Sequence, residues 1–147
     1  MLDPAAALLA IWVKRFKGGP MDAVEEAQLE PGKGLAGNAN QGGRRQVTIL
    51  DAAVWDAVME ELGARLSPAA RRANLLVRGV ALPRTGGRVL EVGAAQVRIL
   101  GPTQPCNRME ETLRGLEAAL RRDWRGGAFG EVIAGGRVRV GDAVRWA

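Results

Sequence analysis

Short hydrophobic runs alternate with glycine-rich breaks along most of this chain. The residues from Leu8 to Phe16 mix β-branched, aromatic and basic side chains, which predicts an early strand that ends at Gly18-Gly19-Pro20. From Met21 to Leu29, the Ala and Glu content favours a helix, whereas the flanking breakers favour a second short strand. Glu30 to Gly43 contains five glycines and no periodicity, which predicts a loop long enough for a binding role.

The middle of the chain changes from strand to helix periodicity. Gln46 to Leu50 predicts a buried strand, and Asp51 is a suitable N-cap for the segment that follows it. The hydrophobic residues after Asp51 recur at helical spacing, which predicts a helix over Ala52–Leu62 with Trp55 in the core. Ser67-Pro68 then opens a short helical turn, and Asn74 to Val77 returns to strand.

The second half of the chain predicts two similar β-ribbons. Each begins at a Gly-Gly pair, continues as an alternating strand and ends at a glycine turn, over Gly86–Gly93 and Gly135–Gly141. The expected return strands are Val97–Leu100 and Ala143–Trp146, and Phe129–Ile133 leads into the second ribbon.

Between the ribbons, Met109–Arg122 predicts a single second helix. Its exposed face offers two i,i+4 ion pairs, Glu110–Arg114 and Glu117–Arg121. Many short strands with two helices indicate a mainly β protein, a β-barrel with helical insertions, in one domain over residues 1–147.

Two composition counts exclude whole classes of site. The chain has no histidine, so no Ser-His or Cys-His pair and no histidine-ligated metal can form. It has one cysteine, which excludes an internal disulfide, an all-cysteine zinc site and an iron–sulfur cluster held by this chain alone. Any general acid or base must therefore be Asp, Glu, Lys, Cys or part of a bound cofactor.

The net charge of +5 comes mainly from arginine, since only Lys14, Lys17 and Lys33 of the 21 basic residues are lysines. Arginine suits phosphates and other oxyanions, although a high-GC genome also enriches it. The arginines are interspersed with glutamates and few aromatic residues accompany them, so nucleic acid is not the expected partner. The longest apolar run, Ala5 to Val13, is too short to span a bilayer and lacks the basic start of a secretory signal, which favours a cytoplasmic protein.

The single cysteine, Cys106, lies in a loop-like segment after an apolar strand. Pro105 ends that strand, and Arg108 places a cation two residues from the sulfur. Nearby positive charge favours a thiolate, which is both a nucleophile and a soft-metal ligand. A small buried hydrophobe is the alternative, since free cysteine is among the most buried residue types.

Several segments, in order, resemble the MOSC family, named for the C-terminal domain of molybdenum cofactor sulfurase. They are Gly32-Lys33-Gly34-Leu35-Ala36-Gly37-Asn38, Arg44-Arg45-Gln46-Val47-Thr48-Ile49-Leu50, Arg71-Arg72-Ala73-Asn74-Leu75, the Pro105-Cys106 loop and the closing strands from Gly135 to Asp142. The similarity runs from about Leu8 to the end of the chain. It implies a β-barrel and a link to the pyranopterin molybdenum cofactor.

The resemblance also implies roles for particular residues. Cys106 would ligate molybdenum or carry sulfur as a persulfide. Arg72 and Asn74 of the Arg-x-Asn element would lie beside the cofactor, with the arginine fork on its phosphate. Arg44, Arg45 and Arg108 would add contacts to anionic groups, and a solvated surface is the alternative for these three.

Two positions depart from the family pattern. Many members have Gly-Asp where this chain has Gly37-Asn38, so a carboxylate is missing there. Pro105 replaces the arginine that precedes the ligand cysteine in the amidoxime-reducing branch, as in the small bacterial members. The chain also lacks the aminotransferase-like domain of full cofactor sulfurases, so we expect no pyridoxal phosphate chemistry on it.

Three functions remain as hypotheses. The first is a molybdenum-cofactor protein that reduces N-hydroxylated compounds with electrons from a partner reductase. The second is a sulfur carrier that forms a persulfide on Cys106 with sulfur from a separate cysteine desulfurase. The third is a non-catalytic ligand-binding barrel in which Cys106 is merely packed.

Overall fold

The computed structural model describes residues 6–147 and consists mainly of strands. The strands are β1 (Ala7–Lys14), β2 (Met21–Val24), β3 (Glu26–Glu30), β4 (Gly34–Leu35), β5 (Val47–Asp51), β6 (Leu75–Arg78), β7 (Val89–Val92), β8 (Ala95–Pro102), β9 (Ala128–Ala134), β10 (Gly136–Arg139) and β11 (Val144–Trp146). The helices are α1 (Ala52–Leu62), α2 (Asn107–Thr112) and α3 (Leu116–Arg121), with 3₁₀ turns η1 (Pro68–Arg71) and η2 (Arg122–Trp124). The prediction of a mainly β protein is confirmed.

The strands form two sheets that stay open at their edges. The larger sheet has eight strands in the order β11-β7-β8-β9-β5-β6-β1-β2, and the smaller has the order β10-β3-β4. The larger sheet curls toward closure, because the segment before β11 bridges to the start of β1 at Ala143 and Ala7. Backbone hydrogen bonds from Leu8 N to Asp142 O and from Gly141 N to Leu8 O add to this bridge. No strand ladder joins β11 to β1 among the described residues, so the expected barrel is two sheets that are not closed.

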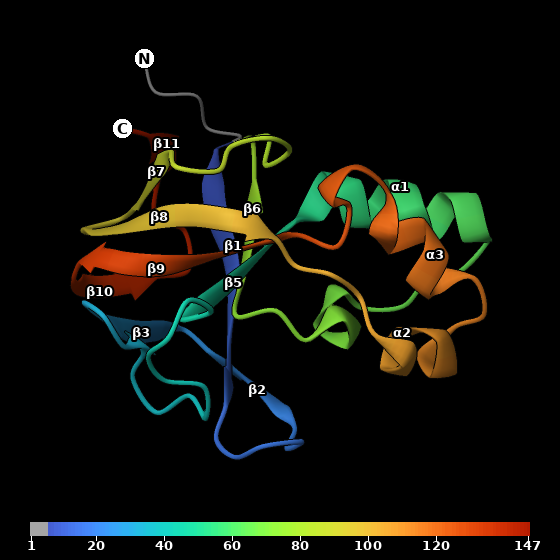
Figure 1. The fold of residues 1–147 in the computed structure, drawn as a ribbon, viewed down its shortest axis with the longest axis horizontal. Coiled ribbons are helices and arrows are strands. Elements are labelled where there is room, and N and C mark those ends of the chain that lie inside the picture. The colour runs from blue at the N-terminus through green and yellow to red at the C-terminus, as the bar shows by residue number, and fades with distance from the viewer. Residues whose placement is uncertain (1–5) are drawn as a thin grey trace.

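Two hydrophobic cores result from this arrangement. One lies among the strands of the two sheets, with fully buried Leu8, Leu29 and Ile99 as examples. The other lies between the larger sheet and the helices, where Trp55 and Leu116 are buried. Figure 1 shows α1, α2 and α3 gathered at one side of the sheets. The β5–β6 connection, which contains α1 and η1, therefore spans the helical side and joins two parallel strands.

Helix α1 has the bounds and the N-cap that the sequence predicts. Asp51 Oδ1 accepts a hydrogen bond from Ala53 N at 3.0 Å, and Gly63 ends the helix in a left-handed conformation with φ +64°. Trp55 is buried in the core, as predicted, and its indole N–H donates to Leu66 O at 3.0 Å.

The single helix expected over Met109–Arg122 is wrong, because the chain forms α2 and α3 with a break between them. Gly115 adopts φ +88° at the break, a conformation that interrupts a helix. Glu110 accepts hydrogen bonds from Gly115 N and Glu117 N across the break, in place of the expected pair with Arg114. The Glu117–Arg121 pair is present at 3.3 Å.

Strand pairing also corrects the second of the two expected ribbons. The β7–β8 hairpin is present, but β10 pairs with β3 and β11 pairs with β7. The residues from Met21 to Leu29 form strands β2 and β3, which resolves their ambiguity. The loop predicted from Glu30 to Gly43 starts one residue later, because Glu30 ends β3, and it contains the two-residue strand β4. Long-range pairing therefore overrides the local symmetry of the two glycine-bounded segments.

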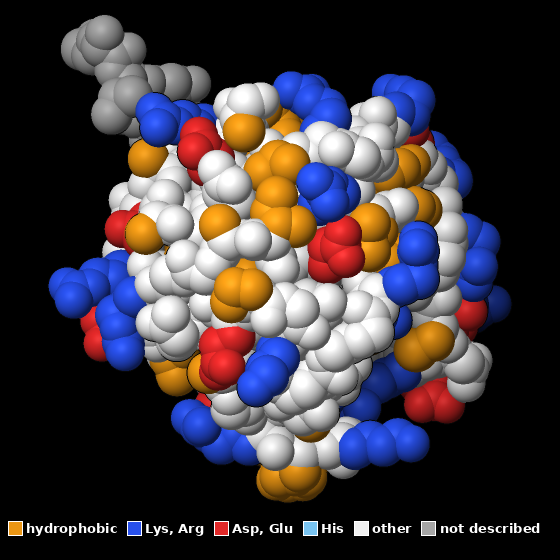
Figure 2. Space-filling model, turned by 60° about the vertical axis from the view of Figure 1, so that its left-hand side comes forward, with side chains coloured by type: hydrophobic (Ala, Val, Ile, Leu, Met, Phe, Trp, Pro, Cys, Tyr) orange, Lys and Arg blue, Asp and Glu red, His pale blue; other side chains and the backbone are white. Residues whose placement is uncertain are grey.

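The surface carries both signs of charge. Figure 2 shows acidic side chains beside many of the basic ones on one face of the molecule. Ion pairs such as Arg98–Glu131 and Arg145–Glu91 account for part of this mixture. Among the described residues, none of the helices has the length and apolarity needed to cross a membrane.

Candidate functional site

Cys106 is exposed at the end of the loop that follows β8, immediately before α2. Its carbonyl accepts a hydrogen bond from Met109 N at 2.9 Å, which begins the helix. The preceding Pro105 is buried, and its carbonyl accepts a hydrogen bond from Arg121 Nη2 at 3.3 Å. The loop is thus held on both sides of the thiol while the thiol itself stays accessible, so the packed-cysteine alternative is wrong.

A cavity of about 200 Å³ lies beside Cys106. Its lining residues come from β1, the turn after it, the segment before β5, η1 and the start of α2; they are Lys14, Gly18, Arg45, Arg71, Arg72, Cys106, Arg108 and Met109. Five of these eight residues are cationic, and none of the eight is acidic. We call this cavity the thiol cavity.

A smaller cavity of about 30 Å³ adjoins the thiol cavity, since Lys14, Arg45 and Arg72 line both. Its other lining residues are polar except for one; they are Met21, Asn38, Asn40, Thr48 and Asn74. The two cavities thus share three cations, and we treat them as one candidate site, with the thiol in the lining of the larger cavity and the buried amides of Asn38 and Asn74 in the lining of the smaller.

The cations of the site repel one another, and this repulsion adds to burial in disfavouring their charged forms. Burial lowers the pKa of Lys14 below its ordinary value, and the charges of Arg72, Arg45 and Arg108 act in the same direction. Burial and Arg108 likewise lower the pKa of Arg72. The pKa of Arg71 is lowered to about 10, mainly by burial and to a lesser extent by the charge of Arg45, while negative charge at Cys106 acts in the opposite direction. A site in which cations destabilise one another favours an anionic ligand.

The predicted site residue Asn74 anchors the inner end of the site. Its Nδ2 donates to Trp12 O and to Asn38 Oδ1, both at 3.2 Å, and its Oδ1 accepts from Thr48 N and Thr48 Oγ1. These contacts occupy both donors and both acceptor positions of the amide. Asn74 therefore holds β1, β5 and the glycine-rich loop together around the site.

Asn38 completes this buried network. Its side chain is 6% exposed, and its Oδ1 accepts from Lys14 N at 2.9 Å as well as from Asn74. The position that lacks a carboxylate thus lies at the floor of the site. Because Asn38 carries a neutral amide and neither cavity has an acidic lining residue, no carboxylate of the lining offsets the cations.

The four predicted arginines differ in their placement. Arg72 lines both cavities and donates from Nη2 to Gly19 O at 2.6 Å, which ties the β1–β2 turn to the site. Arg45 lines both cavities and Arg108 lines the thiol cavity. Arg44 is exposed and belongs to neither cavity lining.

Sequence analysis missed two cations of the site, Lys14 and Arg71. Lys14 ends β1 at the point where the strand reaches the cavity, and a lysine at the end of an apolar strand was its only signal. Arg71 is 6% exposed, but the Arg-x-Asn element marks only its neighbour Arg72, and nothing in the sequence indicates that Arg71 is the buried one. The difference arises at the end of η1, where Arg72 adopts a left-handed conformation with φ +67°.

The protein alone offers a poor metal site. Among the described residues, no three Cys, Asp or Glu side chains come together in a group that could hold a metal ion. A metal at Cys106 would therefore have to bring most of its ligands with it, as a metal held in an organic cofactor does.

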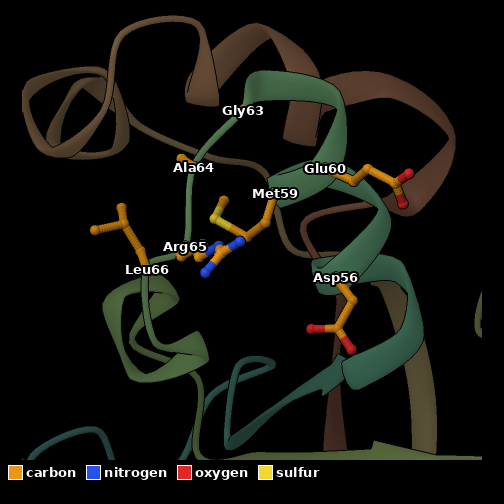
Figure 3. A pocket seen from close by; sticks show the side chains of 7 residues that line it. All are labelled: Asp56, Met59, Glu60, Gly63, Ala64, Arg65 and Leu66. Atoms are coloured by element: carbon orange, nitrogen blue, oxygen red, sulfur yellow. The ribbon is translucent and has the colours of Figure 1, made fainter.

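A larger hollow of about 580 Å³ lies elsewhere, at the end of α1 (Figure 3). In Figure 3 the Met59 and Arg65 side chains lie near one another, and Glu60 points away from them. This hollow shares no lining residue with the thiol cavity, and its lining contains no thiol and only one cation, Arg65. Because the chemistry depends on reactive groups and not on volume, the thiol cavity is the candidate site.

The model of the MOSC domain family matches residues 14–145. The chain belongs to the MOSC domain family. The match covers every residue that lines the thiol cavity and its smaller neighbour. A search of curated proteins finds no relative of this MOSC protein.

Solved structures share the fold of this MOSC protein at low sequence identity. The YuaD protein of Bacillus subtilis is 19% identical with a TM-score of 0.79, and the comparison covers 95% of this chain and 93% of that chain. YiiM of Escherichia coli is 18% identical with a TM-score of 0.71, over 96% of this chain and 69% of that chain. YiiM of Geobacillus stearothermophilus is 16% identical with a TM-score of 0.68, over 99% and 74% of the two chains.

Proposed function

We propose that this MOSC protein binds the pyranopterin molybdenum cofactor and that the Cys106 sulfur is the protein ligand of the metal. The observation that carries the proposal is one exposed thiol in a cavity with five cations and no acidic lining residue. A thiolate suits a soft metal, and arginine forks suit a phosphate. The residues present therefore fit both ends of such a cofactor.

Each residue of the site has a distinct role in this proposal. Arg45, Arg72 and Lys14 line both cavities and would hold the anionic part of the cofactor. Arg108 would add charge near the sulfur, whereas Arg44 would act only from outside the cavity. Asn74 and Asn38 would hold the strands and the glycine-rich loop around the inner end of the site through their hydrogen bonds. When bound, the cofactor supplies oxygen-atom and electron transfer at its metal.

Metal and pterin analysis tests this proposal. The protein is purified from a host that makes the cofactor, and its molybdenum and pterin contents are measured beside those of Cys106→Ser and Arg98→Lys. Arg98 is the control, because it pairs with Glu131 on the exposed surface of β8 and β9. We expect molybdenum and pterin in the wild type and the control, with molybdenum lost from Cys106→Ser. Absence of both from the wild type would contradict the proposal.

The substrate class and the partner are further parts of the proposal. An N-hydroxylated compound is reduced to the amine and water with two electrons and two protons. Because this chain cannot hold an iron–sulfur cluster by itself, the electrons would come from a partner reductase. A cytoplasmic location fits the single free thiol.

A sulfur carrier is the second candidate, and the exposure of Cys106 favours it. The Cys106 thiolate would attack the terminal sulfur of the persulfide on a cysteine desulfurase. A new S–S bond forms on Cys106 as the donor's S–S bond breaks, and the donor keeps its thiolate. Mass spectrometry after incubation with the desulfurase and free cysteine would show a gain of one sulfur atom, and Cys106→Ser would show none. No gain on the wild type would contradict this candidate.

A further inference from the structure

Arg71 lies inside the protein at the point where the thiol cavity meets the Cys106 loop. Its side chain is 6% exposed, whereas the neighbouring Arg72 is only partly buried. Its Nε donates to Gly126 O at 2.9 Å, and its Nη2 donates to Thr103 O at 3.0 Å. A buried guanidinium thus contacts two backbone segments that are distant from it in the sequence.

These hydrogen bonds connect three parts of the chain that meet at the site. Arg71 ends η1, Thr103 lies three residues before Cys106, and Gly126 lies in the turn before β9. The contact is tight, because a Cβ at Gly126 would lie 2.6 Å from Thr103 O and 3.1 Å from Arg71 Nη2. The loop that carries the thiol is therefore fixed at its start by Arg71.

The Arg71 guanidinium keeps donors for a ligand after it has made these contacts. It has five N–H groups, and the two backbone carbonyls engage two of them. Among the described residues, Thr103 Oγ1 is the only fully buried side-chain nitrogen or oxygen without a partner. Nη1 makes neither of these two hydrogen bonds and is not among the fully buried atoms without a partner. Because Arg71 lines the thiol cavity, Nη1 is the donor that an anion in this cavity would meet.

We infer that Arg71 is a positioning residue that fixes the Cys106 loop and donates from its free N–H groups to an oxyanion bound beside the thiol. The inference rests on the proposed function and deepens it, since it names the protein group that would hold an oxyanion close to the sulfur. A buried, immobilised guanidinium binds an anion with less ordering cost than the exposed Arg45 and Arg108 side chains do.

The test uses inorganic phosphate and, in a separate titration, molybdate as probes. Binding is measured by calorimetry for wild type, Arg71→Met, Arg71→Lys and the surface control Arg98→Lys. Alkylation of Cys106 by a neutral reagent is followed at one fixed pH, with and without saturating phosphate. Circular dichroism and thermal unfolding confirm that each variant is folded.

We expect phosphate to bind the wild type and to slow alkylation of Cys106. Arg71→Met should weaken phosphate binding by roughly tenfold or more and abolish the protection, because charge-assisted hydrogen bonds are lost. Arg71→Lys keeps the charge without the fork, so it should restore part of the affinity but leave the loop less ordered, with faster alkylation in the absence of phosphate. Arg98→Lys should match the wild type.

Two results would overturn the inference: a wild type that binds neither probe, or a folded Arg71→Met or Arg71→Lys variant that matches the wild type in affinity and protection. If Arg71→Met does not fold, Arg71→Lys decides by the same criterion. The cofactor proposal fails separately, when purified protein contains neither molybdenum nor pterin. In that case, phosphate binding that depends on Arg71 would still support the role of Arg71 as an oxyanion donor.

Discussion

At the scale of single residues, position 38 sets the charge of the site. Asn38 Oδ1 accepts from Lys14 N and Asn74 Nδ2, and a carboxylate oxygen can accept the same two hydrogen bonds. We predict that Asn38→Asp raises the free energy of unfolding of the ligand-free protein and weakens phosphate binding by roughly tenfold or more, because a negative charge then lies among the cations. Chemical denaturation and calorimetry measure the two effects.

Asn40→Asp is the matched control for this change. Asn40 lines the same small cavity but is exposed, so the same charge is better screened there. Its effects on stability and affinity should be smaller. Equal effects from the two variants would show that the buried floor of the site has no special electrostatic role.

Arg72 combines a side-chain role with a backbone cost. It has φ +67°, a conformation that favours glycine, while its side chain donates to Gly19 O. We predict that Arg72→Gly and Arg72→Ala lose phosphate affinity to the same extent, but that the glycine variant is more stable by roughly 1 kcal/mol. Denaturation and calorimetry on both variants check this. A more stable alanine variant would show that the left-handed backbone does not decide stability here.

Arg98 is a better surface control for the Arg72 variants than Arg121 is. Arg121 pairs with Glu117 on α3, as the sequence predicts, but its Nη2 also donates to Pro105 O. Its replacement would therefore disturb the Cys106 loop. Arg98, which lies on β8 and pairs with Glu131, is a control without that contact.

At the scale of elements, the break between α2 and α3 determines how the helices pack beside the Cys106 loop. Gly115 has φ +88°, and a Cβ there would lie 3.3 Å from Leu62 Cδ2 of α1. We predict that Gly115→Ala costs more than the roughly 1–2 kcal/mol of a left-handed alanine, because it also strains the contact with α1. The free energy of unfolding measures this cost.

Gly87→Ala separates the two contributions at Gly115. Gly87 has φ +89° with nothing within 4 Å of its Cβ position, so it reports the backbone cost alone. Gly115→Ala should be the more destabilising of the two. If both variants lose the same stability, the packing of the α2–α3 break on α1 contributes nothing.

At the scale of the whole molecule, the cation cluster makes stability depend on pH. Burial and the neighbouring arginines lower the pKa of Lys14 from 10.5 in the folded protein, so the unfolded chain binds this proton more tightly. Stability of the ligand-free protein should therefore rise as pH rises through the folded pKa toward 10.5. Lys14→Met removes the charge and keeps most of the stem.

We predict that Lys14→Met is more stable than the wild type at pH 7 and that this advantage shrinks as pH approaches 10.5. Denaturant titrations at several pH values measure the difference. Saturating phosphate should reduce the advantage at pH 7, because a bound anion offsets the same repulsion. A difference that stays constant across the pH range would contradict the assignment of the cost to the Lys14 charge.

The fold illustrates how much local sequence can predict. The pattern after Asp51 predicted α1 with its bounds and its N-cap, since capping and helical spacing depend on residues close in sequence. The β7–β8 hairpin followed from its glycine turn for the same reason. The prediction of the second ribbon was wrong, because β10 and β11 each pair with a strand far from them in the chain.

For the candidate site as well, some residues could be selected from the sequence and others only from long-range contacts. Residue chemistry and family resemblance were enough to select Cys106, Arg72 and Asn74, because one thiol and one Arg-x-Asn element leave few choices. Which of two adjacent arginines is buried is a different question. It depends on the end of η1 and on the carbonyls of Thr103 and Gly126, which lie more than thirty residues away in the sequence.

By itself, the sequence determined the mainly β composition and helix α1, and its residue inventory limited the candidate site to one thiol without histidine, because periodicity and residue inventory are local properties. Only the tertiary structure decided that the sheets stay open and that Lys14 and Arg71 join the predicted cations around the thiol. Strand pairing and burial are long-range choices, made when distant segments compete for the same hydrogen-bonding edges and the same core. The site's cationic character is therefore a property of the fold, assembled from residues that no single motif contains.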